Sequence, residues 1–278
     1  MTIPCYTLND GLELPAVGFG TWLVNGAGGV DALVSGIRQG YRLIDSAFNY
    51  ENEGAVGQAI RKAGVPREEL VVTSKLPGRR QEYGQAVRTV EESLYRMGLD
   101  YIDLYLIHWP LPRLGLYVQA WQALVDLKKK GLIRSVGVSN FLTEHLDRII
   151  GETGVTPSVN QIERHPYWPA DDLMDVCAER GIRVEAWSPL GRASTLRDEP
   201  VLLEIGRAHG KTSAQVMLRW HVQAGVVPLP KAADPGRQGD NLDLFDFELT
   251  DDEVARIATL ARPDGRLQGQ DPATYEEF

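Results

Sequence analysis

Short apolar runs alternate with longer segments of helical periodicity along almost the whole chain. Eight of the apolar runs have the length of strands, and we expect these at Val17–Gly20, Leu43–Asp45, Leu70–Ser74, Ile102–Ile107, Ile133–Val138, Ser158–Ile162, Ile182–Trp187 and Val226–Leu229. Segments with apolar residues every three or four positions follow them, and we expect helices at Val30–Gln39, Asn52–Lys62, Gln85–Met97, Tyr117–Lys130, Leu142–Ile150, Asp171–Arg180, Pro200–His209, Ser213–Gln223 and Thr250–Leu260.

The first residues follow another pattern. Cys5–Leu8 and Leu12–Leu14 alternate in polarity on either side of Asn9-Asp10-Gly11, which predicts a β-hairpin. The strand-then-helix order of the remainder predicts a parallel sheet. Eight such units with no Gly/Ser- or Pro-rich linker favour a closed barrel over an open sheet, and no Gly-x-Gly-x-x-Gly follows a strand. We therefore predict an α/β protein, a (β/α)8 TIM barrel with an N-terminal β-hairpin, as a single domain over residues 1–278.

Composition narrows the possible partners. The 278 residues are 43% hydrophobic and 24% charged, as in ordinary globular domains, and the formal charge of −9 argues against a broad nucleic-acid surface. Cys5 and Cys177 are in no metal-binding spacing, so we expect free thiols, no metal and a reducing compartment. No basic stretch precedes an apolar one at the start, and no apolar run could span a bilayer. We expect a cytoplasmic monomer with no membrane or nucleic-acid partner.

Titratable residues of four kinds follow successive predicted strands. Asp45, Lys75 and His108 come at the ends of the second, third and fourth strands, and Tyr50 lies on the loop after Asp45. Each alone could be structural: a loop cap, a solvated lysine, a satisfied core histidine and a rim aromatic. Together they indicate an active site, because the carboxyl ends of barrel strands meet on one rim.

These side chains suit the protonation of an alkoxide. A phenol with a pKa of about 10 is a poor acid near neutrality, and an ammonium such as Lys75 beside it would lower that pKa. Asp45 would keep Lys75 charged when buried. His108 could orient and polarise a carbonyl oxygen that gains charge. We therefore expect Tyr50 to be a general acid in carbonyl reduction.

Six longer motifs resemble the aldo-keto reductase family, and they extend over nearly the whole chain: Gly18–Trp22, Asp45–Glu53, Met97–Pro110, Gly137–Phe141, Asn160–Glu163 and Trp187–Gly191. The stretch around His108 is the longest and most specific. Many members carry Tyr at the position of Trp187. A tryptophan there resembles the bacterial diketo-gluconate reductase branch of the family. The resemblance implies a catalytic tetrad of Asp45, Tyr50, Lys75 and His108.

The resemblance also implies NADPH/NADP+ as cofactor and a small carbonyl compound as substrate. Ser139, Asn140 and Gln161 match the residues that hold the nicotinamide carboxamide, and Trp187 would stack on the ring. The full implied set of cofactor contacts is Gly20, Thr21, Trp22, Asp45, Ser139, Asn140, Gln161, Trp187, Ser188, Leu190, Gly191, Lys231, Arg237 and Asn241. Ser139 and Asn140 could instead cap a helix, Trp187 could be a core residue and Lys231 a surface one. Trp22, Tyr50, His108, Trp109 and the C-terminal tail would wall an apolar substrate pocket.

Departures from the family pattern concern the adenosine 2′-phosphate. Lys231 and Arg237 match its two cations, but Ala232 stands where the family usually has Ser or Thr. Asp234 replaces a neutral or basic residue and would repel the phosphate if it faced the pocket. Gly236 and Gly239 weaken the short helix that the resemblance places around Arg237. We expect NADPH to be preferred by a smaller margin than in relatives with the hydroxyl.

The sequence thus predicts NADPH-dependent reduction of aldehydes or ketones, including diketo acids, α-keto esters and reactive aldehydes. Two alternatives stay open. One is a non-catalytic NADPH-binding regulatory barrel. The other is a lyase that uses Lys75 as a Schiff-base nucleophile and needs no dinucleotide.

Overall fold

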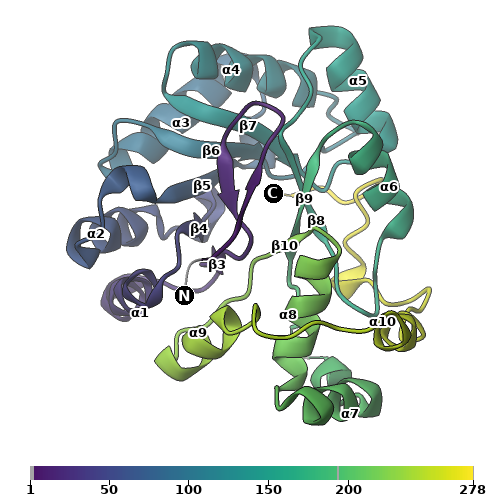
Figure 1. Cartoon of the computed structure of the whole chain (residues 1–278). Helices are drawn as coiled ribbons and strands as arrows, with labels where there is room; N and C mark the ends of the chain where they lie inside the picture. The colour runs from purple at the N-terminus through teal and green to yellow at the C-terminus, as the bar shows by residue number, and fades with distance from the viewer. Residues whose placement is uncertain (1–2, 193, 278) are drawn as a thin grey trace.

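A computed structural model describes residues 3–192 and 194–277. Eight parallel strands pair in chain order, each with the next (Figure 1). They are β3 Phe19–Gly20, β4 Leu43–Asp45, β5 Val71–Leu76, β6 Ile102–Ile107, β7 Ile133–Ser139, β8 Val159–Glu163, β9 Arg183–Trp187 and β10 Val227–Pro228. Backbone bonds from Gly18 N to the Pro228 oxygen and from Gly20 N to the Pro230 oxygen, both 3.0 Å long, join the first strand to the last. The sheet is therefore closed, and the predicted barrel is confirmed.

Close packing at this junction explains why the first strand carries glycines. A Cβ on Gly20 would lie 2.6 Å from the Leu229 backbone oxygen, and one on Gly18 would lie 2.5 Å from the Leu229 side chain. A side chain on Gly20 would therefore require the backbone to move, and one on Gly18 would require the leucine side chains around it to move. The glycines thus allow β3 and β10 to come together.

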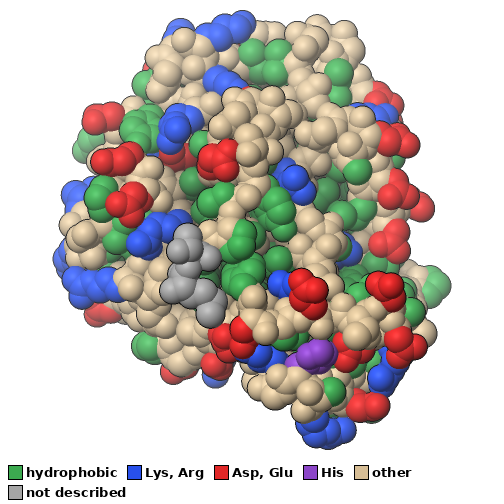
Figure 2. Space-filling view, in the orientation of Figure 1, with side chains coloured by type: hydrophobic (Ala, Val, Ile, Leu, Met, Phe, Trp, Pro, Cys, Tyr) green, Lys and Arg blue, Asp and Glu red, His purple; other side chains and the backbone are tan. Residues whose placement is uncertain are grey.

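The N-terminal hairpin closes one end of the barrel. Its strands, β1 Cys5–Thr7 and β2 Glu13–Pro15, pair antiparallel, as predicted. Leucines of the hairpin, Leu8, Leu12 and Leu14, pack with residues near the beginnings of the strands, among them Leu43 and Val71. Figure 1 shows the hairpin lying across the barrel mouth, and Figure 2 shows hydrophobic side chains gathered beside it. The opposite end, where the strands finish, is left for a site.

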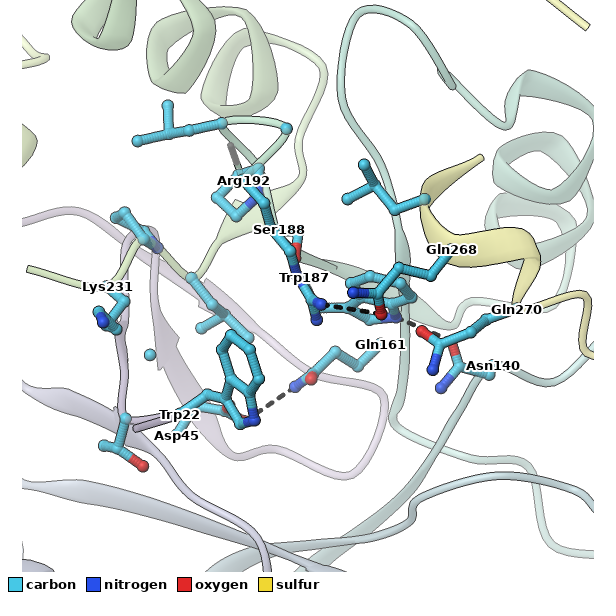
Figure 3. A pocket seen from close by; sticks show the side chains of 18 of the residues that line it. Trp22, Asp45, Asn140, Gln161, Trp187, Ser188, Arg192, Lys231, Gln268 and Gln270 are labelled. Carbon is cyan, nitrogen blue, oxygen red and sulfur yellow. Dashed lines mark hydrogen bonds between the residues drawn. The ribbon is translucent and has the colours of Figure 1, made fainter. Parts of the chain in front are cut away.

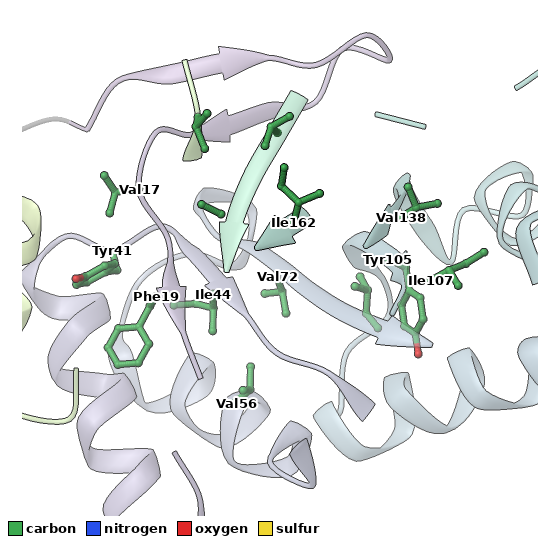
Figure 4. Close-up of a cluster of buried hydrophobic side chains, with 14 of the residues drawn as sticks. Val17, Phe19, Tyr41, Ile44, Val56, Val72, Tyr105, Ile107, Val138 and Ile162 are labelled. Atoms are coloured by element: carbon green, nitrogen blue, oxygen red, sulfur yellow. The ribbon is translucent and has the colours of Figure 1, made fainter. Parts of the chain in front are cut away.

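The helices form the outer layer: α1 Gly26–Gln39, α2 Glu53–Ala63, α3 Tyr83–Met97, α4 Tyr117–Lys129, α5 Thr143–Thr153, α6 Asp171–Glu179, α7 Pro200–His209, α8 Ser213–Gln223, α9 Pro235–Leu242 and α10 Asp251–Ala258. Most of them turn an apolar stripe towards the sheet; α3, for example, buries Ala86, Val90 and Leu94 at four-residue spacing. Figure 4 shows the layer between strands and helices, where Phe19, Ile44 and Val56 meet.

Hydrophobic periodicity does not predict α9, and this helix completes the ring. It packs between α8 and α1, whereas α10, the helix expected last, packs on α7. The reason is chemical: the buried residues of α9 are polar, Gln238 and Asn241. Gln238 Nε2 donates to the backbone oxygens of Ala32 and Ala232, so hydrogen bonds hold this helix where an apolar stripe holds the others.

No helix in the described part of the chain is long and apolar enough to cross a membrane. Among the same residues, no group of three or more His, Cys, Asp or Glu side chains is arranged to hold a metal ion. Cys5 is exposed and Cys177 is buried, and both are free thiols.

Candidate active site

A cavity of about 940 Å3 opens at the end of the barrel where the strands finish. Most of the predicted site residues line it, as Figure 3 shows for Trp22, Gln161 and Trp187. The predicted residues in its wall are Gly20, Thr21, Trp22, Asp45, Tyr50, His108, Trp109, Asn140, Gln161, Trp187, Ser188, Leu190, Gly191, Lys231 and Arg237. Lys75, Ser139 and Asn241 are buried behind that wall.

A buried ion pair forms the floor of the cavity. Lys75 Nζ donates to Asp45 Oδ1 at 2.7 Å, to Asp45 Oδ2 at 2.8 Å and to the Ser46 backbone oxygen at 2.8 Å. Burial is the largest single influence and lowers the pKa of Lys75, but Asp45, Tyr50 and Glu185 together raise it by more, so the net shift is upward. Lys75 is therefore an ammonium ion with all three protons donated to oxygen.

Tyr50 lies directly above this pair, on the short 3₁₀ turn Phe48–Tyr50 that follows β4. Lys75 Nζ is 5.1 Å from the centre of the Tyr50 ring, and the His108 ring is 5.9 Å away, edge to face. Burial raises the pKa of Tyr50, and the Lys75 charge opposes this without reversing it. The sequence-based expectation of a lowered phenol pKa is wrong for this structure, because desolvation outweighs the attraction of the ammonium.

Gln161 joins the ion pair to a second carboxyl group. Its Nε2 donates to Asp45 Oδ1 at 2.9 Å and to Glu185 Oε2 at 2.8 Å, and Gln161 lies opposite Glu185 in the β8–β9 register. Burial, and next the charge of Asp45, raises the pKa of Glu185 from 4.5 to about 8. Sequence reasoning missed Glu185. The available signal was an acidic residue between the apolar Val184 and Ala186 of a predicted strand.

The ends of β7 and β9 are tied together by side-chain hydrogen bonds. Trp187 Nε1 donates to Asn140 Oδ1 at 2.8 Å, and Asn140 Nδ2 donates to the His108 backbone oxygen at 3.0 Å. Ser139 Oγ donates to the Gln161 backbone oxygen at 2.8 Å, which keeps its hydroxyl out of the cavity. Asn140 and Ser188 have left-handed backbones, with φ of 61° and 49°, a strained geometry that accumulates at functional sites.

Two exposed cations occupy the rim beyond β10. Lys231 follows the strand and Arg237 lies on α9, and within the described chain neither forms a salt bridge. Asp234 Oδ1 accepts from Arg237 N at 3.0 Å and caps the N-terminus of α9. The aspartate that the sequence left as a possible repulsive charge therefore has a structural role as well.

The segment after α10 covers one side of the cavity with residues that sequence reasoning did not single out. Gln268 accepts from Arg192 Nη1 at 3.2 Å, while Arg192 Nε donates to Ser188 Oγ at 2.8 Å. The Arg192 guanidinium lies 4.6 Å from the Trp22 ring (Figure 3). Arg192 thus links the loop after β9 to this final segment. No hydrophobic period marks either region, so only the fold brings them together.

The substrate end is less apolar than expected. Tyr275 packs on Trp109 with ring centres 4.5 Å apart, which extends the aromatic wall. Beside it the Glu277 carboxylate lies 2.8 Å from His108 Nδ1 and accepts from Asn49 Nδ2, also at 2.8 Å. The prediction that the final segment contributes to the wall agrees with the lining, but the prediction of an apolar pocket is wrong at Glu277.

Comparisons with known proteins agree with one another. The sequence profile described as "Aldo/keto reductase family" matches residues 16–262. A 2,5-diketo-D-gluconic acid reductase B from a Corynebacterium species is 50% identical over 99% of each chain, and a methylglyoxal reductase from Escherichia coli is 42% identical over 96% of each. A Bombyx mori aldo-keto reductase, crystallised in complex with NADP, superposes with a TM-score of 0.91 at 36% identity and covers 100% of this chain and 99% of its own.

Proposed function

This chain belongs to the aldo/keto reductase family, and we propose that it reduces aldehydes and ketones with NADPH, with Tyr50 as the proton donor. The observation that carries the proposal is the buried Asp45–Lys75 ion pair directly beneath the Tyr50 ring, at the floor of a large cavity. A phenol, an ammonium and an imidazole in contact are the groups required to protonate a developing alkoxide.

The residues present fit a nicotinamide dinucleotide phosphate. Lys231 and Arg237 are exposed cations with no carboxylate partner in the described chain, as a binding site for a 2′-phosphate requires. The loop Ser188–Gly191 presents left-handed backbone at Ser188 and Gly191, in the wall between that rim and the cavity floor. Trp187 offers an indole face close to Gln161 and Asn140. When bound, the reduced nicotinamide supplies a hydride for a carbonyl carbon.

The chain's own residues then hold the carbonyl and move the proton. A carbonyl oxygen between Tyr50 and His108 would accept hydrogen bonds from both, which favours the growing negative charge on that oxygen. The Tyr50 phenol gives its proton to the oxygen, and Lys75 stabilises the phenolate that remains. Asp45 and the Ser46 carbonyl fix the ammonium in place, so the charge needs no rearrangement during the reaction.

Different observations bear on the two alternatives, the Schiff-base lyase and the regulatory barrel. A Schiff-base role for Lys75 requires a neutral amine with a free lone pair, but this amine is buried, charged and bonded to three oxygens. A regulatory barrel without turnover requires no Tyr50–Lys75–Asp45 arrangement. Carbonyl reduction is therefore the function in which Tyr50, Lys75 and Asp45 all have a role.

The direct test is a panel of carbonyl compounds assayed with NADPH and with NADH. It should include methylglyoxal, an α-keto ester and a diketo sugar acid, with consumption of the cofactor followed by absorbance. We expect turnover of at least one class, faster with NADPH. Tight NADPH binding with no turnover across the panel would support the regulatory alternative instead. Borohydride trapping of Lys75 without cofactor would support the lyase.

A further inference from the structure

We propose that Glu277 makes the substrate end of the cavity select uncharged carbonyl compounds against those that carry a carboxylate. The inference rests on the proposed reductase function and names its substrate class. Glu277 is not part of the tetrad, and it belongs to the segment after α10. Glu277 lines the same cavity as Tyr50, His108 and Trp109.

The Glu277 carboxylate is held in a defined position by its neighbours. Oε1 accepts from Asn49 Nδ2 at 2.8 Å and lies 2.8 Å from His108 Nδ1, and Oε2 accepts from the Gly78 backbone N–H at 3.0 Å. Asn49, Gly78 and His108 belong to the loops after β4, β5 and β6. Three consecutive loops thus hold one carboxylate, and its position is well defined.

The carboxylate is ionised throughout the range in which an enzyme would work. Burial by itself would raise the pKa of Glu277, but His108, the Gly78 N–H and Asn49 together lower it to about 2. The charge of His108 is the first of these lowering causes, while the Gly78 N–H and Asn49 are neutral donors that favour the carboxylate without cancelling its charge. An ionised carboxylate therefore stands at a fixed position in the wall, with His108 as its nearest cationic group.

Apart from His108, which contacts Glu277 directly, the cationic side chains of the cavity are not placed to neutralise this charge. Lys231 follows β10 and His108 follows β6, and the two strands are four places apart in a ring of eight (Figure 1). Arg192, Arg197, Lys231 and Arg237 also line the cavity, yet among the described residues none of them forms a salt bridge with Glu277. The same cavity is also lined by the aromatic rings of Tyr50, Trp109 and Tyr275.

A substrate whose carbonyl lies between Tyr50 and His108 must place its remaining atoms near these walls. A carboxylate there would lose water and meet the Glu277 charge across aromatic surface, where screening is weaker than in bulk water. A neutral ester or aldehyde of the same shape meets no such repulsion. Discrimination of this kind lowers the affinity for one partner by an unfavourable charge.

The experiment uses a matched pair of aldehydes, terephthalaldehydic acid and its methyl ester, which share the reacting group. The quantity measured is the ratio of kcat/KM for the acid to kcat/KM for the ester, at saturating NADPH, neutral pH and one ionic strength. A variant that affects His108 chemistry or folding changes kcat/KM for both substrates by the same factor. The ratio then stays unchanged.

We expect Glu277→Gln to raise the acid-to-ester ratio roughly fivefold to tenfold, the size of one close charge repulsion at partial screening. Glu277→Asp keeps the charge and should keep the wild-type ratio. Glu276→Gln removes a charge from the neighbouring residue, which contacts the Arg113 backbone and does not line the cavity, and it should also keep the ratio. In the wild type, added salt should raise the ratio, a measurement that needs no variant.

An unchanged ratio in Glu277→Gln, or an equal rise in Glu276→Gln, would overturn the inference while leaving the reductase proposal intact. If the variant does not fold, a wild-type ratio that is independent of salt overturns it as well. Failure of the wild type to reduce either aldehyde, or any member of the panel above, would count against the proposed function itself.

Discussion

The rim after β10 and the rim after β6 face each other across one cavity, yet their side chains are held in different ways. Around β6, the Tyr50, His108 and Glu277 side chains lie in contacts supplied by several loops. Beyond β10, Lys231 and Arg237 are exposed and form no salt bridges within the described residues. The side chains around β6 are thus already fixed by their neighbours. Those beyond β10 present positive charge that no carboxylate in the described residues pairs with.

This difference follows from what each region would do. Chemistry at a carbonyl needs groups fixed before the substrate arrives, because any rearrangement during the reaction adds to the barrier. Recognition of a phosphate needs accessible donors whose charge is not already paired. The comparison predicts that substitutions in the two regions have separable effects, on turnover in one and on cofactor choice in the other.

The largest expected effect is at the organised end. Tyr50→Phe should lower kcat about 10²–10⁴-fold, because the general acid is lost while the Lys75 ammonium remains beneath the ring. The dissociation constant for NADPH, measured by fluorescence quenching, should change little. Tyr83→Phe removes an exposed hydroxyl bonded to Asp126 and serves as the matched control. Turnover near the wild-type rate in Tyr50→Phe would remove Tyr50 from the mechanism.

At the opposite rim, Arg237→Ala should reduce the preference for NADPH over NADH by roughly tenfold to a hundredfold, the value of one charge-assisted contact to phosphate. The rate with saturating NADH should stay close to that of the wild type. Arg256→Ala, which removes a surface arginine paired with Glu204 on another face, is the control. A cofactor ratio that Arg237→Ala leaves unmoved would show that this rim does not bind the phosphate.

A smaller effect separates the two roles of Asp234. Asparagine at this position can still accept the bond from Arg237 N and cap α9, but it carries no charge. We expect Asp234→Asn to raise the NADPH preference a few-fold by removing repulsion. Asp234→Ala loses the cap as well, so it should lower thermal stability. Its NADPH preference should rise by less than that of Asp234→Asn. Equal cofactor ratios in the wild type and the Asn variant would mean that this charge does not reach the phosphate.

The smallest effect concerns Glu185, which lies beneath both regions. Its pKa is raised on folding, from 4.5 to about 8, so its contribution to stability is present below 4.5 and is lost as the pH rises through about 8. Glu185→Gln is neutral at every pH and should remove this loss. Melting temperatures across that window should fall by a few degrees less in the variant than in the wild type. Parallel curves would show that Glu185 is not protonated in the folded protein.

How far the sequence could predict these regions depends on what holds them. Asp45, Tyr50, Lys75 and His108 stand at or just after strand ends, and strand ends are visible as breaks in hydrophobic pattern. Convergence of those ends is a consequence of barrel closure, so the organised floor of the cavity could be predicted.

Other features could not be predicted because they depend on polar contacts between distant segments. α9 is held by Gln238 rather than by an apolar stripe, and Glu277 reaches His108 from a segment with no periodicity. The direction of the Tyr50 pKa shift was also missed, since it depends on how deeply the ring is buried. Sequence patterns carry little information about such desolvation.

The central claim is that this cavity carries out hydride transfer from NADPH to a carbonyl carbon with a proton from Tyr50. The most direct test uses NADPH deuterated at the hydride-donating carbon of the nicotinamide, in each of its two configurations, with an aldehyde that the enzyme reduces. The account predicts an alcohol carrying one deuterium on its carbinol carbon from one of the two cofactors, formed about 10²–10⁴-fold more slowly by Tyr50→Phe. An alcohol without deuterium from either cofactor, or equal labelling rates from the wild type and Tyr50→Phe, would contradict it.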